Sequence, residues 1–174
     1  AQSVLVSTLP TYQPDLPNLR ACITNKTKAI VGNSPNNPTG AVYNKKTLEE
    51  IASIAKEHDL FVISDEIYEY FNFGKTEHFS IGSIYPNTIT MNGFSKSYAM
   101  TGWRLGYISG PREIIDAVNQ LQQYTVFSSS SIAQHAAIEA LKELPNIKEK
   151  YQENRKLLIK ELKSMGYEIN GLEG

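Results

Sequence analysis

The sequence predicts an α/β protein in which helices cover both faces of a central sheet. Short apolar segments typical of strands alternate with longer segments in which apolar residues recur at helical spacing. The chain has 174 residues, of which 41% are hydrophobic and 20% are charged. A chain of this size and composition can bury a substantial core, so we expect one soluble globular unit.

Five short segments are expected to form strands because each is apolar and bounded by turn-forming residues. They are residues 4–8, 28–33, 60–67, 88–94 and 104–109, and a further strand is expected to begin at 167–170. The stretches 10–17 and 34–40 are rich in proline and polar turn residues, which predicts loops. Residues 34–40 in particular require one specific loop conformation.

Four helices are expected between and after these strands. The first covers 47–58 and is expected to begin with a capping box made by Thr47 and Glu50. The others cover 112–124, which begins after Pro111, then 130–144 and 146–165. Gly166 is well placed to end the last helix as a C-terminal cap.

Charge and composition exclude several classes of function. The formal net charge is −1 and the isoelectric point is about 6.4, which gives no electrostatic reason to expect nucleic-acid binding. No apolar run approaches the roughly 20 residues that span a bilayer, and the N-terminus lacks the basic start of a secretory signal. A single cysteine, Cys22, fits a reducing compartment. We therefore expect a cytoplasmic protein without membrane or nucleic-acid partners.

The sequence lacks the residue patterns typical of metal sites and of nucleotide sites. The three histidines, His58, His78 and His135, stand apart from acids and cysteines at metal-ligand spacing. The sequence also contains neither a GxxxxGK loop nor a GxGxxG motif after a strand. We expect no metal site and no dinucleotide site.

The segment from Gly93 to Gly106 carries the most informative pair of residues. Lys96 follows a turn of small residues, and Arg104 comes eight positions later in a segment expected to be buried. Partial burial near another cation would favour a neutral lysine amine, which is the nucleophile that forms a Schiff base with a carbonyl. The arginine guanidinium is a rigid fork suited to a phosphate. An aldehyde and a phosphate on one molecule describe pyridoxal 5′-phosphate (PLP).

Two further segments should meet this lysine at the carboxyl edge of the sheet, where open α/β folds bind ligands. Asn37 lies in the loop after the strand at 28–33, and its amide could hold a phenolic oxygen. Asp65 ends the apolar strand at 60–67, where a carboxylate needs a cation such as a protonated pyridine nitrogen. Tyr68, three residues later, could donate a hydrogen bond to the ring oxygen.

These three motifs, in this order, resemble the class I and II aminotransferases of PLP fold type I. They are residues 33–40, the stretch Ser64-Asp65-Glu66-Ile67-Tyr68, and the lysine segment from Gly93 to Gly106. The resemblance covers about residues 16–174. It implies a three-layer α/β sandwich with a mostly parallel central sheet, and a PLP-dependent enzyme that moves an amino group between an amino acid and a 2-oxo acid.

The resemblance also implies a role for each matching residue. Lys96 would hold PLP as a Schiff base and later shuttle the proton, and Asp65 would pair with the pyridine nitrogen. Tyr68 and Asn37 would bind the ring oxygen, and Arg104 with Ser95 would bind the phosphate. Some relatives carry a serine where this chain has Gly93, so Ser95 is the local candidate for the hydroxyl contact.

The resemblance further implies the domain organisation. Residues 1–145 would be a PLP-binding large domain incomplete at its N-terminus, 146–165 a helix linking two domains, and 166–174 the truncated start of a small domain. A phosphate-binding turn, a ring-stacking aromatic residue and a carboxylate-binding arginine would lie outside the chain. A homodimer is expected, and the identity of the amino-acid substrate is left open.

Three alternatives remain open at this point. The same scaffold could support a β-lyase or a synthase, which would release a product such as pyruvate and ammonia instead of passing the amino group to a 2-oxo acid. An aminotransferase-like domain could also serve as a non-catalytic sensor of PLP or an amino acid. Finally, these residues could form a folding unit without activity.

Overall fold

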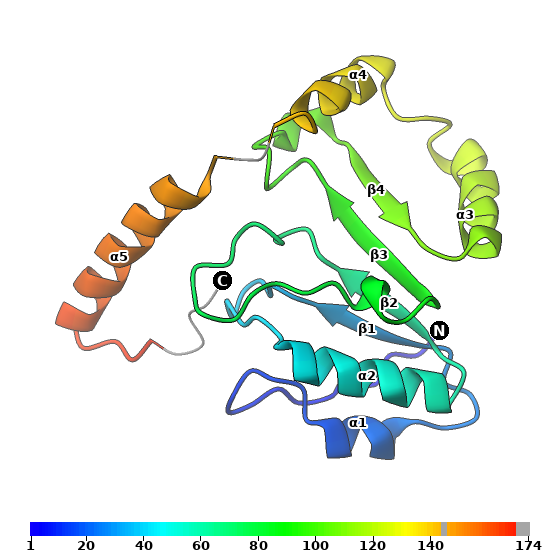
Figure 1. The fold of residues 1–174 in the computed structure, drawn as a ribbon, viewed down its shortest axis with the longest axis horizontal. Helices are drawn as coiled ribbons and strands as arrows, with labels where there is room; N and C mark the ends of the chain where they lie inside the picture. The colour runs from blue at the N-terminus through cyan, green and yellow to red at the C-terminus, as the bar shows by residue number, and fades with distance from the viewer. Residues whose placement is uncertain (144–145, 170–174) are drawn as a thin grey trace.

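The computed structural model describes residues 1–143 and 146–169 and shows a four-stranded sheet with helices around it (Figure 1). The strand order follows the sequence, β1-β2-β3-β4. The first three strands run parallel, and β4 is antiparallel to β3. The strands are β1 Ala29–Asn33, β2 Phe61–Asp65, β3 Thr88–Gly93 and β4 Gly106–Ser109. The predicted α/β fold with a mostly parallel sheet is confirmed.

The helices fall into three groups around this sheet (Figure 1). Helices α1 and α2 lie side by side next to β1 and β2, α3 and α4 lie near β4, and α5 stands apart beyond the carboxyl ends of the parallel strands. Their bounds are α1 Leu16–Cys22, α2 Lys45–Glu57, α3 Arg112–Thr125, α4 Ser131–Ala140 and α5 Lys148–Ser164. Two short 3₁₀ helices, η1 Ile81–Ser83 and η2 Thr101–Trp103, lie before β3 and β4.

Two apolar clusters form the core. The larger one joins the inner face of α2 to the sheet, and Ile54 and Ala55 are almost completely buried in it beside Val62. The smaller cluster forms where Ala137 of α4 packs against Phe94, just after β3. The larger cluster fixes the parallel strands, and the smaller one supports the loop that carries Lys96.

Alternation along β2 separates the two faces of the sheet. Val62 and Ser64 are buried on the face that α2 covers, whereas Ile63 and Asp65 are partly exposed on the opposite face. The register pairs Asp65 with Asn33 on one side and with Met91 on the other. Asp65 therefore lies at the carboxyl end of the central strand, on the face that is less covered by the described part of the chain.

The N-terminal segment differs from the sequence prediction. Residues 4–8 do not form a strand, and Val4 and Leu5 are 63% and 91% exposed. An apolar segment becomes a strand only where a neighbouring strand offers hydrogen-bond partners. Helix α1 begins within the predicted turn because the Asp15 side chain accepts a hydrogen bond from the Asn18 amide, 3.0 Å away.

The start of α2 also differs from the prediction. The helix begins at Lys45, and its cap is Asn44, whose side-chain oxygen accepts a 2.9 Å hydrogen bond from the Thr47 amide. Thr47 is itself buried in the first turn, so the predicted capping box of Thr47 and Glu50 is wrong. At the other end of the chain, residues 167–169 are not in a strand, and Asn170 lies outside the described residues.

Gly93, where β3 meets β4, has no room for a side chain. A Cβ atom there would lie 3.0 Å from the Gly106 Cα atom and 3.1 Å from the Leu105 carbonyl oxygen. Because both neighbours are backbone atoms, we expect Gly93→Ala to lower the free energy of unfolding by about 1–3 kcal/mol. The matched control is Gly102→Ala, since a Cβ atom at Gly102 meets nothing within 4 Å.

Chemical denaturation of the two variants checks this prediction. The strands must separate to admit the Gly93→Ala methyl group, so only that variant should lose stability. Equal stability of both variants would contradict the close approach of β3 and β4.

Candidate active site

Three segments converge at one edge of the sheet, because β1, β2 and β3 run in the same direction and end side by side. The loop at 34–40 follows β1, the turn from Asp65 to Tyr68 follows β2, and the loop that carries Lys96 follows β3. Each holds a residue that the sequence assigned to the candidate site.

Asn33, the last residue of β1, ties the first two segments together. Its side-chain oxygen accepts hydrogen bonds from the Asn36 side chain and from the Asn37 amide, both 3.1 Å away. Its side-chain nitrogen donates a 3.0 Å bond to the carbonyl oxygen of Asp65. These bonds fold the asparagine-rich loop back over the end of β2 and bring Asn37 toward the turn that carries Tyr68.

Asn37, Tyr68 and Lys96 meet at this edge. The Asn37 side-chain nitrogen donates a 3.0 Å hydrogen bond to the Tyr68 hydroxyl oxygen. The Lys96 ammonium nitrogen lies 5.7 Å from the centre of the Tyr68 ring, within the range of a cation–π contact. The Tyr68 hydroxyl keeps its own proton, and Asn37 keeps a second N–H, so both can still donate to a ligand oxygen.

The Asp65 carboxylate is held in place by the turn that follows it. One carboxylate oxygen, Oδ1, accepts a 3.1 Å hydrogen bond from the Ile67 amide. Within residues 1–143 and 146–169, the structure gives the second oxygen no protein partner. Asp65 therefore presents an oriented acceptor to a cationic ligand group at the sheet edge.

The expected phosphate ligands are less completely assembled. Arg104 is exposed, in the left-handed region with φ 51°, and its Nη1 atom donates a 3.0 Å hydrogen bond to the Thr101 carbonyl oxygen. The segment around Arg104 is exposed rather than buried, and Lys96 is exposed as well, so both expectations of burial are wrong. Ser95 is half-buried. Within the described residues its side chain makes no hydrogen bond to Arg104, which instead binds the Thr101 carbonyl oxygen.

One hydroxyl beside Lys96 lacks a partner. Ser97 is 1% exposed, and its hydroxyl oxygen has no hydrogen-bond partner within the described residues. A buried hydroxyl without a partner costs free energy. The loop that carries Lys96 is thus not shaped for maximal stability, which is common at ligand-binding sites.

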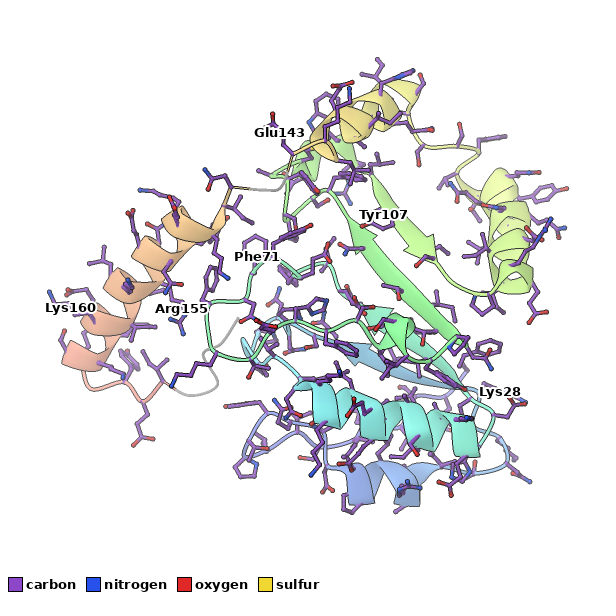
Figure 2. All side chains as sticks on the ribbon, in the orientation of Figure 1. Lys28, Phe71, Tyr107, Glu143, Arg155 and Lys160 are labelled. Carbon is purple, nitrogen blue, oxygen red and sulfur yellow. The ribbon has the colours of Figure 1, made fainter. Side chains whose placement is uncertain are left out.

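Aromatic contacts connect the site with α5. The Tyr68 ring makes an edge contact with Phe71, and Phe71 makes a closer edge contact with Tyr151 of α5, with ring centres 5.0 Å apart. Figure 2 shows Phe71 on the loop that faces α5, and the Arg155 guanidinium lies 6.0 Å from the Phe73 ring. Helix α5 therefore packs on the same loop that positions Tyr68.

Two other tyrosines near the site are held in their neutral form. Tyr70 contacts Tyr98 edge-on, and Tyr107 lies against Phe94. Burial raises the pKa of both phenols, and the nearby Glu69 carboxylate raises each pKa further. Neither phenol is therefore expected to act as a base at neutral pH.

The chain matches a known protein family. The model of the family "Aminotransferase class I and II" matches residues 1–173. The chain belongs to the class I and II aminotransferase family. Enzymes of this family depend on PLP.

Several curated proteins are similar to this chain over nearly its whole length. An aspartate aminotransferase of Pyrococcus abyssi is 44% identical, over 91% of this chain and 44% of the relative. An aspartate/prephenate aminotransferase of Thermus thermophilus is 45% identical, over 94% of this chain and 45% of the relative. The solved structure of a double mutant of Thermus thermophilus aspartate aminotransferase superposes with a TM-score of 0.88 at 44% identity, over 95% of this chain and 46% of that one. The chain thus spans less than half the length of these three relatives.

Two features that some proteins carry are absent from the part of the chain that the structure describes. Across 1–143 and 146–169, no helix is both long and apolar enough to cross a membrane. In the same residues, no three histidine, cysteine, aspartate or glutamate side chains are grouped as metal ligands would be.

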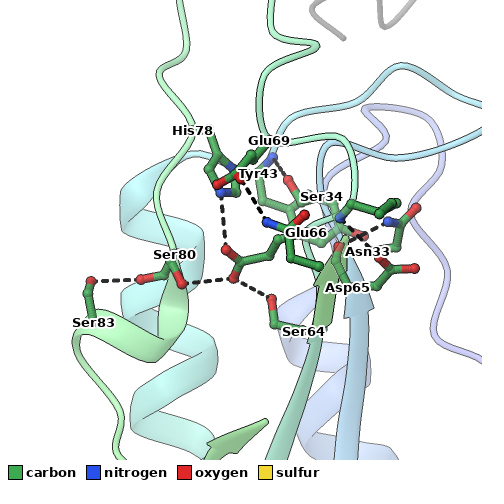
Figure 3. Close-up of polar contacts among 12 residues, drawn as sticks. Asn33, Ser34, Tyr43, Ser64, Asp65, Glu66, Glu69, His78, Ser80 and Ser83 are labelled. Carbon is green, nitrogen blue, oxygen red and sulfur yellow. Dashed lines mark hydrogen bonds and ion pairs between the residues drawn. The ribbon is translucent and has the colours of Figure 1, made fainter. Parts of the chain in front are cut away.

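Sequence reasoning gave no role to Glu66, which follows Asp65 directly. Glu66 is 3% exposed and lies at the centre of a hydrogen-bonded cluster with Ser64, His78 and Ser80 (Figure 3). The burial of Glu66 could have been predicted, because strand alternation places Val62, Ser64 and Glu66 on the buried face. The partners of Glu66 could not be foreseen, since His78 and Ser80 lie on a loop without a repeating pattern.

Proposed function

We propose that the protein is a PLP-dependent aminotransferase that moves an amino group between an amino acid and a 2-oxo acid, with Lys96 as its catalytic lysine. One observation carries this proposal. The Lys96 ammonium lies 5.7 Å from the Tyr68 ring, and the Tyr68 hydroxyl is in turn bound by Asn37, 3.0 Å away. Three segments distant in sequence thus bring an amine, a phenol and an amide together at the carboxyl edge of the sheet.

Each residue of this set fits one part of the cofactor. The Lys96 amine would bind the aldehyde, and the Tyr68 hydroxyl and Asn37 amide would donate to the ring oxygen. The Asp65 carboxylate would accept from the protonated ring nitrogen and keep it charged. Arg104 and Ser95 are the candidates for the phosphate, with the arginine supplying the charge.

PLP, when bound, supplies a ring that withdraws electrons from the substrate Cα atom. The chain's own residues provide the acid–base chemistry around it. The Lys96 amine, when it is free, would be the base that moves the proton leaving the substrate Cα atom. Tyr68, in contact with Lys96, helps to hold the amine in place.

The names of the relatives suggest the substrate class. Relatives are called aspartate, aspartate/prephenate and aromatic-amino-acid aminotransferases, which supports an acidic or aromatic amino acid as donor. We further infer a homodimer in the cytoplasm, a large domain at 1–145, a linking helix at 146–165 and the start of a small domain at 166–174. The packing of α5 on the loop after Tyr68 supports a linking helix placed near the site.

An amino-group transfer assay tests the proposal. Purified full-length protein with PLP is given L-aspartate or an aromatic amino acid, with and without a 2-oxo acid, and the new amino acid is quantified. An aminotransferase forms it only when the 2-oxo acid is present. A β-lyase would instead release pyruvate and ammonia from a β-substituted amino acid without any acceptor, and a sensor would bind PLP without turnover. Either of these results would contradict the proposal.

A further inference from the structure

We propose that Glu66 is a positioning residue, whose buried carboxylate holds the turn that presents Asp65 and Tyr68 to the cofactor. This inference rests on the proposed function for the roles of Asp65 and Tyr68. It goes beyond that function because Glu66 faces away from the site and would act only through its neighbours.

The carboxylate of Glu66 is fully engaged by the protein (Figure 3). Its Oε1 atom accepts hydrogen bonds from the Ser64 hydroxyl at 2.8 Å and from the Ser80 hydroxyl at 2.9 Å. Its Oε2 atom lies 3.2 Å from the Nε2 atom of His78. The three partners come from three places: the strand before the turn, the loop after it, and the residue that caps η1.

Burial increases the structural effect of losing any of these contacts. The Glu66 side chain is 4% exposed and that of His78 is 16% exposed. A buried carboxylate is costly unless hydrogen-bond donors replace the water it loses, and removing one partner of such a set is more damaging than removing a surface contact. The cluster therefore fixes one arrangement of the chain around Glu66.

The backbone of Glu66 transmits this constraint to the site. Its amide donates a 2.9 Å hydrogen bond to the Met91 carbonyl oxygen, and its carbonyl oxygen accepts one of 2.9 Å from the Glu69 amide. These bonds enclose the turn in which the Ile67 amide holds the Asp65 carboxylate. Because side chains alternate along a strand, Asp65 points to the opposite face from Glu66. One acid thus anchors the turn, and its neighbour is left available to a ligand.

His78 and Ser80 extend the effect to the loop beyond Tyr68. They lie twelve and fourteen residues after Glu66, so their bonds to Glu66 close the segment 67–77 into a loop with both ends fixed. That loop carries Tyr68 and the aromatic residues that contact α5. Other charged groups near His78 are Glu69, Glu77 and Lys148, which line a cavity of about 220 Å³ with it.

Two substitutions of Glu66 distinguish the effect of its hydrogen bonds from the effect of its side-chain volume. Glu66→Gln keeps an oxygen for both serine hydroxyls, and its amide can donate to Nε2 of a neutral His78. Glu66→Met fills a similar volume but removes every acceptor. Ser80→Ala removes a single donor and serves as a milder variant if Glu66→Met does not fold. The matched control is Tyr85→Phe, which removes the 2.7 Å bond from the buried Tyr85 hydroxyl to the Leu60 carbonyl, at the other end of β2.

The first readout is amide hydrogen exchange of the full-length protein without PLP. We expect peptides covering residues 65–69 to exchange about 10- to 100-fold faster in Glu66→Met and about 2- to 10-fold faster in Ser80→Ala, since bonds to a charged acceptor are lost. Glu66→Gln should exchange close to the wild-type rate. Tyr85→Phe should lower the melting temperature while leaving exchange at 65–69 unchanged.

The second readout is PLP binding, followed by the near-visible absorption of the cofactor. Glu66→Met and Ser80→Ala should displace Asp65 and Tyr68. Both variants should therefore bind PLP more weakly, and the absorption band of the bound cofactor should respond differently to pH. Glu66→Gln should keep the wild-type PLP affinity and the wild-type pH response. The inference is overturned if the Glu66 and Ser80 variants lose only overall stability, as Tyr85→Phe does. If wild-type protein fails to bind PLP, the proposed function fails, and the exchange rates still decide whether Glu66 holds the turn.

Discussion

Replacing Lys96 by alanine should abolish amino-group transfer. The change removes both the amine that would bind the cofactor aldehyde and the base that would move the substrate proton. Loss of a positioned acid–base group alone lowers the rate on the order of 10²–10⁴-fold. Because Lys96→Ala removes two roles together, we expect its rate to fall by at least about 10⁴-fold. Steady-state rates of the full-length enzyme with saturating PLP measure the effect.

A second exposed lysine provides the control for Lys96→Ala. Lys75 lies on the exposed loop after Tyr68 and has no assigned role, so Lys75→Ala should retain the wild-type rate. Because Lys96 is itself exposed, its removal should leave the melting temperature almost unchanged. Substantial activity in Lys96→Ala would show that another residue is the catalytic amine.

Replacing Asp65 by asparagine is the change with the second largest expected effect. Asparagine can still accept the hydrogen bond from the Ile67 amide, which is 3.1 Å from Oδ1, so the turn should persist. The negative charge that keeps the ring nitrogen protonated is lost. Removal of one preorganised electrostatic contact lowers kcat by about 10²–10³-fold, and we expect Asp65→Asn to fall in this range.

The control for Asp65→Asn is Asp116→Asn on the exposed side of α3. Asp116 lies 3.5 Å from Arg112, and its side chain is 61% exposed. An exposed pair of this kind contributes little to stability, so this variant should keep its rate and its melting temperature. A wild-type rate in Asp65→Asn would remove the aspartate from the proposed cofactor set.

The convergence of the site was predictable because strand direction determines it. Asn37 and Tyr68 are 31 residues apart, yet both follow parallel strands, and their side chains form a hydrogen bond at the shared edge. The same reasoning placed Lys96 near Tyr68, after the third parallel strand. Pattern and turn chemistry were sufficient here because each motif directly follows a strand.

Features that depend on packing were not predictable in this way. The exposure of Lys96 and Arg104 depends on which segments lie over them, and glycines and apolar neighbours in the sequence wrongly indicated burial. Asn44 and Thr47 are both residue types that cap helices, and the structure shows Asn44 as the cap of α2, with Thr47 buried in the first turn. The partners of Glu66 lie up to fourteen positions away from it across an irregular loop, which no periodic pattern reveals.

Covalent trapping of PLP tests the central claim most directly. Full-length protein is mixed with PLP, its near-visible spectrum is recorded, the sample is reduced with borohydride, and the modified peptide is mapped. We predict an absorption band of lysine-bound cofactor and a pyridoxyl group on Lys96, both of which are lost in Lys96→Ala. No band, or label spread over surface lysines such as Lys75 and Lys148, would contradict the assignment of Lys96 as the residue that binds the cofactor.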